Sequence, residues 1–192
     1  MKKGLLIILS GPSGVGKGAT REKIMANNDL KLFYSISMTT REKRPGEVDG
    51  KDYFFVSKEE FERNVKNGNL LEHNTFVGNS YGTPKDKVFE LMEQGKNVLL
   101  EIDVNGAMQV FEKLGHDLPV SIFLMPPSLK ELEDRIRGRS TETEKAIEER
   151  LNRARKEIKE KDNYKYVVVN DKLDETVRQI HEIIENEIKY SS

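Results

Sequence analysis

The stretch LLIILSGPSGVGKG, residues 5–18, sets the fold of this chain. Its first part, Leu5–Leu9, is a short apolar run without alternation, which is typical of a strand buried on both faces. The glycine-rich turn after it opens a helical pattern over residues 17–27. In a phosphate loop of this kind, backbone N–H groups turn inward around phosphate oxygens and Lys17 reaches the β- and γ-phosphates. The sequence therefore predicts a nucleotide-binding loop that comprises Gly11, Pro12, Ser13, Gly14, Val15, Gly16, Lys17 and Gly18.

Three further apolar runs follow along the chain, and a helical pattern comes after each of them. Short strands that alternate with helices predict right-handed crossover units and a three-layer α/β core with a parallel sheet. The predicted strands are 98–102, 120–124 and 166–169, and the predicted helices are 104–114, 128–138 and 172–189.

The segment 35–96 breaks this alternation. Asp49-Gly50 is a hairpin signal, and Ser57 with Glu60 forms a capping-box pattern at the start of a short helix. We therefore predict an antiparallel α+β lobe that is inserted into the core. Its predicted strands are 52–56, 70–77 and 79–81, and a helix over 84–94 returns to the core.

Residues 127–161 predict a pair of helices. The first ends at Gly138, and the second begins with another capping-box pattern, Thr141–Glu144. An apolar stripe at helical spacing then follows, made by Ile147, Leu151, Ala154 and Ile158. We expect one domain whose core covers about 1–34, 97–126 and 162–192, with a lobe at about 35–96 and a lid region at about 127–161.

Composition excludes several classes of protein. The chain has 192 residues, 32 basic and 33 acidic side chains and no cysteine. A net charge of -1 argues against a nucleic-acid or membrane-surface binder, and the lack of cysteine excludes a disulfide scaffold. Leu5–Leu9 is too short for a signal peptide or a transmembrane helix, so we expect a cytoplasmic protein.

With the inserted lobe in view, the sequence resembles the guanylate kinase family over nearly its whole length. The resemblance rests on an ordered set of motifs: SGPSGVGK at 10–17, SMTTREKRPGE at 37–47, GKDY at 50–53, LE at 71–72, YGT at 81–83, EID at 101–103, GRSTE at 138–142 and VND at 169–171. It implies a core, a GMP-binding lobe and a lid. It also implies an enzyme that transfers a phosphoryl group from ATP to GMP, and to dGMP, with Mg²⁺.

The transfer chemistry explains why arginines would matter. The attacking oxygen belongs to the GMP phosphate, whose second pKa is near 6, so no general base is needed. Positioning and charge stabilisation would supply most of the catalysis, and arginines bind phosphates in bidentate fashion. The resemblance implies catalytic roles for Lys17, Arg41, Arg139 and Arg150, and ATP contacts from Arg135, Arg139 and Asn170. We interpret Arg137, Arg153 and Arg155 as surface residues.

The resemblance also implies the residues that bind GMP. Glu72 would accept the N1–H and 2-amino donors of guanine, and Thr83 would donate a hydrogen bond to the O6 acceptor. The phosphate would lie among Ser37, Arg41, Arg44, Tyr53 and Tyr81. Glu101 and Asp103 alternate at the end of a core strand, where ligands bind in open α/β sheets. They could contact GMP or hold magnesium through water.

One position departs from the phosphate-loop pattern. Gly18 stands where Ser or Thr normally holds magnesium, and Thr20, the first hydroxyl, is offset along the helix. We therefore assign no metal ligand in the protein. Magnesium would sit on the ATP phosphates and keep several waters, and other nucleotide-kinase loops resemble this Gly-Lys-Gly form.

Three other functions remain to be weighed. A kinase for another small molecule is disfavoured by Glu72 and Thr83. A non-catalytic, protein-binding module of this fold would tend to lack Lys17, Arg139 and Arg150. A switch GTPase would need an Asn-Lys-x-Asp pattern, which the sequence lacks.

We also hypothesise that 137–157 closes only when both nucleotides are bound. The sequence does not distinguish a monomer from a homodimer.

Overall fold

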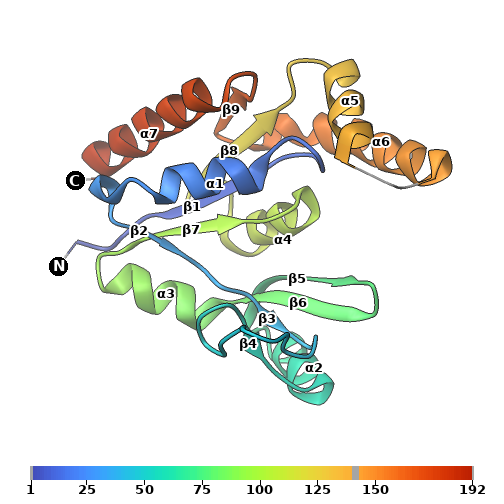
Figure 1. Cartoon of the computed structure of the whole chain (residues 1–192). Coiled ribbons are helices and arrows are strands. Elements are labelled where there is room, and N and C mark those ends of the chain that lie inside the picture. The colour runs from blue at the N-terminus through green and yellow to red at the C-terminus, as the bar shows by residue number, and fades with distance from the viewer. Residues whose placement is uncertain (1, 140–142, 192) are drawn as a thin grey trace.

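The core of the molecule is a five-stranded parallel sheet. The structure is a computed structural model that describes residues 2–139 and 143–191. The strand order is β2-β7-β1-β8-β9, with every neighbouring pair parallel (Figure 1). The bounds are β1 Leu6–Ser10, β2 Leu32–Tyr34, β7 Asn97–Glu101, β8 Val120–Met125 and β9 Tyr166–Val169. The predicted α/β class with a parallel sheet is confirmed.

Helices cover both faces of this sheet, which explains the unbroken apolar runs. In β1, Ile7 and Leu9 pack toward α1 (Lys17–Met25) and α7 (Leu173–Tyr190). Leu6 and Ile8 pack on the other side, toward α3 (Lys85–Glu93) and α4 (Val104–Leu114). In Figure 1, α1 and α7 lie above the strands and α3 and α4 below them. The sheet therefore presents its carboxyl end, where β1 meets the phosphate loop, between two helical layers.

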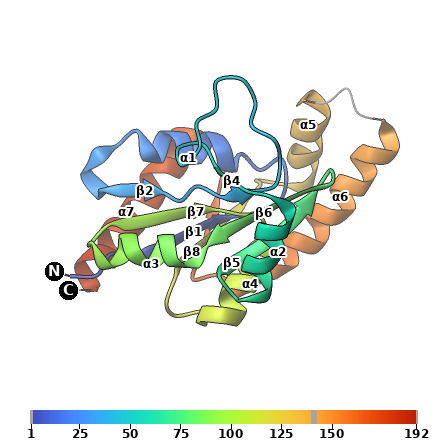
Figure 2. The same cartoon turned by 90° about the horizontal axis from the view of Figure 1, so that it is seen from below.

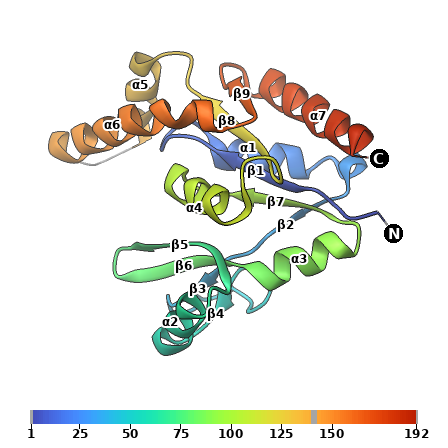
Figure 3. The ribbon, with the colours of Figure 1, turned by 180° about the vertical axis from the view of Figure 1, so that it is seen from behind.

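A second, four-stranded sheet forms the lobe, with the order β4-β3-β6-β5. Its elements are β3 Met38–Thr39, β4 Phe54–Phe55, β5 Leu70–Phe76, β6 Asn79–Pro84 and the helix α2 Lys58–Lys66. The pairs β3–β6 and β5–β6 are antiparallel, whereas β3–β4 is parallel. Figure 3 shows the lobe below the core from behind.

The predicted hairpin at Asp49-Gly50 is wrong. The Asp49 carboxylate accepts a hydrogen bond of 2.9 Å from the Phe55 backbone N–H, and Asp52 accepts one of 2.7 Å from Val48. These side chains close a long loop, so the chain returns to the sheet in the same direction as β3 and not in the opposite one. Figure 2 shows this loop projecting from the lobe before β4.

Two helices, α5 (Leu129–Arg139) and α6 (Glu144–Ile158), form a unit beside the core (Figure 1). They share a small hydrophobic cluster of Leu132, Ile136, Ile147, Leu151 and Ala154. The predicted capping box begins at Thr141, which lies outside the described residues; α6 is capped by Thr143, whose side chain accepts from the Ala146 N–H. Two short 3-10 helices, Asn28–Leu30 and Lys159–Asn163, complete the chain.

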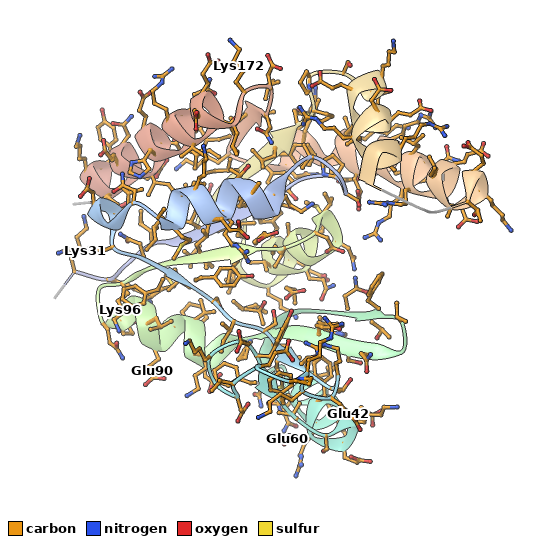
Figure 4. The ribbon with its side chains drawn as sticks, viewed as in Figure 1. Lys31, Glu42, Glu60, Glu90, Lys96 and Lys172 are labelled. Carbon is orange, nitrogen blue, oxygen red and sulfur yellow. The ribbon has the colours of Figure 1, made fainter. Side chains whose placement is uncertain are left out.

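Charged side chains cover the outside of the molecule. Glu42, Glu60 and Lys172 point away from the ribbon in Figure 4, and all three are exposed. Across residues 2–139 and 143–191, the structure contains no helix of the length and apolar character that crossing a membrane requires.

Candidate active site

The phosphate loop joins β1 to α1 and is tightly packed. Gly16 caps α1 with φ 100°, and a Cβ there would lie 2.7 Å from Asn170 Nδ2. A Cβ at Gly14, where φ is 85°, would lie 2.9 Å from Ile136 on α5. Lys17 folds back over the loop, and its ammonium donates to the carbonyls of Gly11 (2.6 Å) and Pro12 (3.1 Å). The loop therefore has no room for a side chain at Gly14 or Gly16, and its carbonyls hold the Lys17 ammonium in place.

Lys17 lies at an open cavity of about 360 Å³ that also contains acidic side chains. Burial lowers the pKa of Lys17, and the carboxylates of Glu157, Glu101 and Asp103 oppose that shift. Glycine backbone lines the rest of the cavity, with Gly14, Gly16 and Gly18 among its residues. A lysine ammonium beside a glycine-rich loop at the start of a helix is suited to binding phosphate oxygens.

The start of α1 offers no hydroxyl to a metal ion. Gly18 has no side chain, and the Thr20 hydroxyl is buried and donates to the Gly16 carbonyl at 2.8 Å. No group of three or more His, Cys, Asp or Glu in the described part of the chain is arranged to hold a metal ion. At Gly18 and Thr20, the start of α1 therefore offers no side-chain oxygen to a magnesium ion.

The other side of the loop brings together two residues that we expect to contact ATP. Arg135 and Asn170 line a cavity of about 220 Å³ with Val15 and Gly16. Arg135 donates to the Asn170 carbonyl at 3.1 Å, and the Asn170 amide donates to the Val15 carbonyl at 2.8 Å. The end of β9 is thus tied to the phosphate loop.

The helices α5 and α6 carry the other predicted arginines. Arg150 on α6 donates to the Ser13 hydroxyl at 3.0 Å, so it reaches the phosphate loop. Arg139 is the last residue of α5, and its side chain lies outside what the structure describes. The structure therefore places Arg150 at the loop.

At the inner end of the lobe, Glu72 and Thr83 form a buried polar pair. Glu72 on β5 is 7% exposed and Thr83 on β6 is 3% exposed. The Thr83 hydroxyl donates to Glu72 Oε1 at 2.5 Å. Burial raises the pKa of Glu72, and the Thr83 hydrogen bond opposes that rise. A Cβ at Gly106 on α4 would lie only 3.0 Å from Glu72 Oε2, so the carboxylate rests against backbone.

The outer end of the lobe gathers cationic and aromatic side chains. Arg41 donates to Glu47 through two hydrogen bonds of 2.7 and 3.1 Å, and its guanidinium carbon lies 5.3 Å from the Tyr53 ring centroid. The Tyr53 and Tyr81 rings are 6.2 Å apart. Ser37 and Tyr53 line a cavity of about 360 Å³. Arg44 is exposed and joins the cluster through its backbone N–H, which donates to Glu47.

Glu101 and Asp103 both line the cavity that contains Lys17. Glu101 forms an ion pair of 3.3 Å with Arg21 on α1. Asp103 caps α4 by accepting from the Gly106 N–H at 2.8 Å and forms an ion pair of 3.0 Å with Arg153. The structure brings the two carboxylates together but gives each a different basic partner.

Two arginines of this region were missed from the sequence. Arg153 was predicted to be a surface residue; its side chain is 54% exposed, yet it lines the Lys17 cavity and bonds two carboxylates there. Arg21 lies one helical turn after Lys17, and that spacing is a signal that could have found it. Arg153 carries no comparable local signal, because Asp103 is 50 residues away.

A glycine-rich loop between a central parallel strand and a helix, with an inserted lobe and an arginine-bearing helical pair, defines a P-loop nucleotide kinase fold. The Guanylate kinase family profile matches residues 3–187. The chain belongs to the guanylate kinase family.

Named relatives agree with this assignment. A guanylate kinase of Mesoplasma florum is 54% identical over 182 residues, covering 95% of this chain, which spans 61% of that relative's length. A guanylate kinase of Streptococcus thermophilus is 51% identical over 186 residues, covering 97% of this chain and 88% of the relative. The crystal structure of guanylate kinase from Anaplasma phagocytophilum has a TM-score of 0.71 at 36% identity, covering 97% and 87% of the two chains.

Proposed function

We propose that this chain transfers the γ-phosphoryl group of ATP to GMP, and also to dGMP, to give ADP and GDP. The observation that carries the proposal is the buried pair of Glu72 and Thr83, in a molecule that also has a phosphate loop with Lys17. The guanylate kinases that it resembles over 95–97% of its length support the same reaction.

Guanine recognition would follow from the chemistry of the buried pair. The N1–H and 2-amino groups of guanine are donors on one edge, and the Glu72 carboxylate can accept from both. To donate to O6, the Thr83 hydroxyl would turn its single proton away from Glu72 Oε1, which leaves both Glu72 oxygens for the guanine donors. Adenine presents a different edge and would leave the buried carboxylate unpaired, which disfavours AMP strongly.

The transfer step would need charge stabilisation and no general base. The GMP phosphate is largely deprotonated at neutral pH, because its second pKa is near 6. Arg41, with Arg44, Ser37, Tyr53 and Tyr81, would bind that phosphate.

Lys17, Arg139 and Arg150 would stabilise charge on the transferred group. Arg135 and Asn170 would contact ATP, and Glu101 and Asp103 would line the GMP side. Mg²⁺ would sit on the ATP phosphates, keep several waters and neutralise phosphate charge.

The three regions would then have separate tasks. We propose that the core binds ATP, that residues 35–96 bind GMP, and that residues 137–157 of the lid region close when both nucleotides are present and so limit ATP hydrolysis. We expect the reaction to take place in the cytoplasm. Hydrogen exchange across the described parts of 137–157 would be slowest with ADP and GMP together, and equal protection with one nucleotide or with two would contradict closure.

The test of the function is ADP production from MgATP by the purified protein, with GMP, AMP, UMP or no acceptor. We expect rapid turnover with GMP alone. Equal turnover with AMP would mean that Glu72 and Thr83 have another role. No turnover with any acceptor, from protein whose circular dichroism shows that it is folded, would favour a binding module of the same fold.

A further inference from the structure

Arg153 occupies a place in the Lys17 cavity to which the proposed mechanism assigns no role. It lies on α6, facing the carboxyl end of the core sheet. Its Nη2 is 3.0 Å from Asp103 Oδ2, and its Nε is 2.9 Å from Glu157 Oε1. One guanidinium therefore bonds a carboxylate of the core and a carboxylate of its own helix.

The charge balance of this cavity depends on that guanidinium. Three carboxylates, those of Glu101, Asp103 and Glu157, line it with the cations of Lys17 and Arg153. The Glu157 side chain is only 10% exposed, and its Oε2 is buried with no hydrogen-bond partner in the described part of the chain. Without Arg153, Asp103 and Glu157 would each lose the basic partner of their ion pair and would face a cavity that must receive phosphate groups, at a substantial electrostatic cost.

Asp103 is also a junction between parts of the molecule. It caps α4 through the Gly106 N–H and accepts from the Asn74 amide of β5 at 3.3 Å. Arg153 adds α6 to this junction. The same residue that offsets the carboxylates thus fixes α6, which carries Arg150, against the core and the lobe.

We propose that Arg153 is a positioning residue for phosphoryl transfer, which holds α6 at Asp103 and neutralises Asp103 and Glu157 so that nucleotide phosphates can lie beside Lys17. This inference rests on the proposed function. Arg153 need not touch the substrates, because it acts through the two carboxylates. The proposal concerns the residue's charge, so a neutral side chain of similar size should not replace it.

The first experiment compares Arg153→Gln and Arg153→Lys with the wild type. We expect Arg153→Gln to raise the KM values for MgATP and GMP about tenfold, as the loss of one charged interaction would. Arg153→Lys keeps the charge and should recover most of that loss. Arg155→Gln is the matched control, because Arg155 is exposed on the same helix and bonds Asn152; its KM values should stay at the wild-type level.

A charge-removal variant separates this role from a structural one. In Arg153→Gln/Glu157→Gln, one of the two uncompensated carboxylates is gone, so the KM values should fall back to within about threefold of the Glu157→Gln values. Thermal melting shows whether each variant is folded. A folded Arg153→Gln enzyme with wild-type KM values would overturn the proposal, and so would a double variant with no recovery.

A binding measurement keeps this test independent of the reaction. Calorimetry with a non-hydrolysable MgATP analogue should show about tenfold weaker binding to Arg153→Gln than to the wild type. If the wild type fails to use GMP, the proposed function is wrong, yet this result still stands or falls by itself. Equal affinity of the two proteins for the analogue would contradict the role of Arg153.

Discussion

The phosphate end and the base end of the proposed active site are built in different ways. At the phosphate end, consecutive residues from Gly11 to Lys17 supply backbone groups and one ammonium, which is held by carbonyls of its own loop. At the base end, Glu72, Thr83 and Gly106 come from β5, β6 and α4, and the polar groups are side-chain atoms. The phosphate end is one continuous stretch of main chain. The base end is assembled from side chains of a β-hairpin, with the backbone of α4 beside them.

This difference matches what each end would bind. All nucleotides carry the same phosphate oxygens, which backbone N–H groups and a lysine can bind without regard to the base. The two purine bases share a ring system and differ in their donors and acceptors, so choosing one of them requires buried side chains that the wrong purine leaves unpaired. A substitution at the phosphate end should therefore reduce turnover with every acceptor nucleotide, whereas a substitution at the base end should change which acceptor is preferred.

The largest effect is expected at the phosphate end. Lys17→Ala removes the cation that would stabilise charge on the transferred group, so kcat/KM should fall about 10³-fold with GMP and in similar proportion with any weaker acceptor. A coupled assay for ADP measures this. Residual GMP turnover within about tenfold of the wild type would show that Lys17 only packs against its loop.

A smaller and selective effect is expected at the base end. Thr83→Val keeps the side-chain shape but removes the hydroxyl that bonds Glu72, so kcat/KM for GMP should fall about 30-fold while that for AMP stays constant. Thr75→Val, an exposed change on β5, is the control and should leave both values unchanged. An equal loss for GMP and AMP would show that Thr83 supports the fold and not the choice of base.

The sequence predicts the elements that carry a local signal and misses those that depend on contacts with distant residues. The apolar runs predicted β1, β7, β8 and β9 to within a residue or two, because burial on both faces leaves a continuous signal. The strands β2 and β3 are three and two residues long, too short for any periodicity, and they are fixed by pairing with distant strands. The hairpin prediction at Asp49-Gly50 was wrong for the same reason, since the direction of β4 after this loop is fixed by its parallel pairing with β3.

The site shows the same limit. The phosphate loop could be predicted from its own residues, with the lysine and glycines in place. Glu72 and Thr83 could be proposed only from a family resemblance, because the hairpin that places them on neighbouring strands does not indicate that they bind a base. Arg153 was interpreted as a surface residue because its helix is rich in charge, and its partner Asp103 is far away in sequence.

The pH dependence of GMP use should give the smallest of these effects. Burial raises the pKa of Glu72 above the ordinary 4.5; Asp103 adds to the rise, while Thr83 and Lys113 oppose it. Guanine needs the ionised carboxylate, so the KM for GMP should rise several-fold from about pH 7.5 to about pH 5.5, where the GMP phosphate also titrates.

The variant Glu72→Gln isolates the contribution of the carboxylate, since the phosphate titration is common to both proteins. Its KM for GMP should rise less steeply over the same pH range. The free energy of unfolding should change with pH in the opposite direction to GMP binding. Because burial raises the pKa of Glu72, its protonated form stabilises the folded protein, and this contribution is lost as pH rises through the folded pKa. Parallel pH profiles for the two enzymes would show that Glu72 does not titrate in this range.

The central claim is that Glu72 selects the base while the phosphate loop does not. The most direct test is the ratio of kcat/KM for GMP to that for IMP, which has the same phosphate, N1–H and O6 but lacks the 2-amino group. We predict a wild-type preference for GMP of about 10²-fold or more, which falls below about tenfold in Glu72→Gln because GMP use declines. A Glu72→Gln enzyme that keeps the wild-type ratio would contradict the claim.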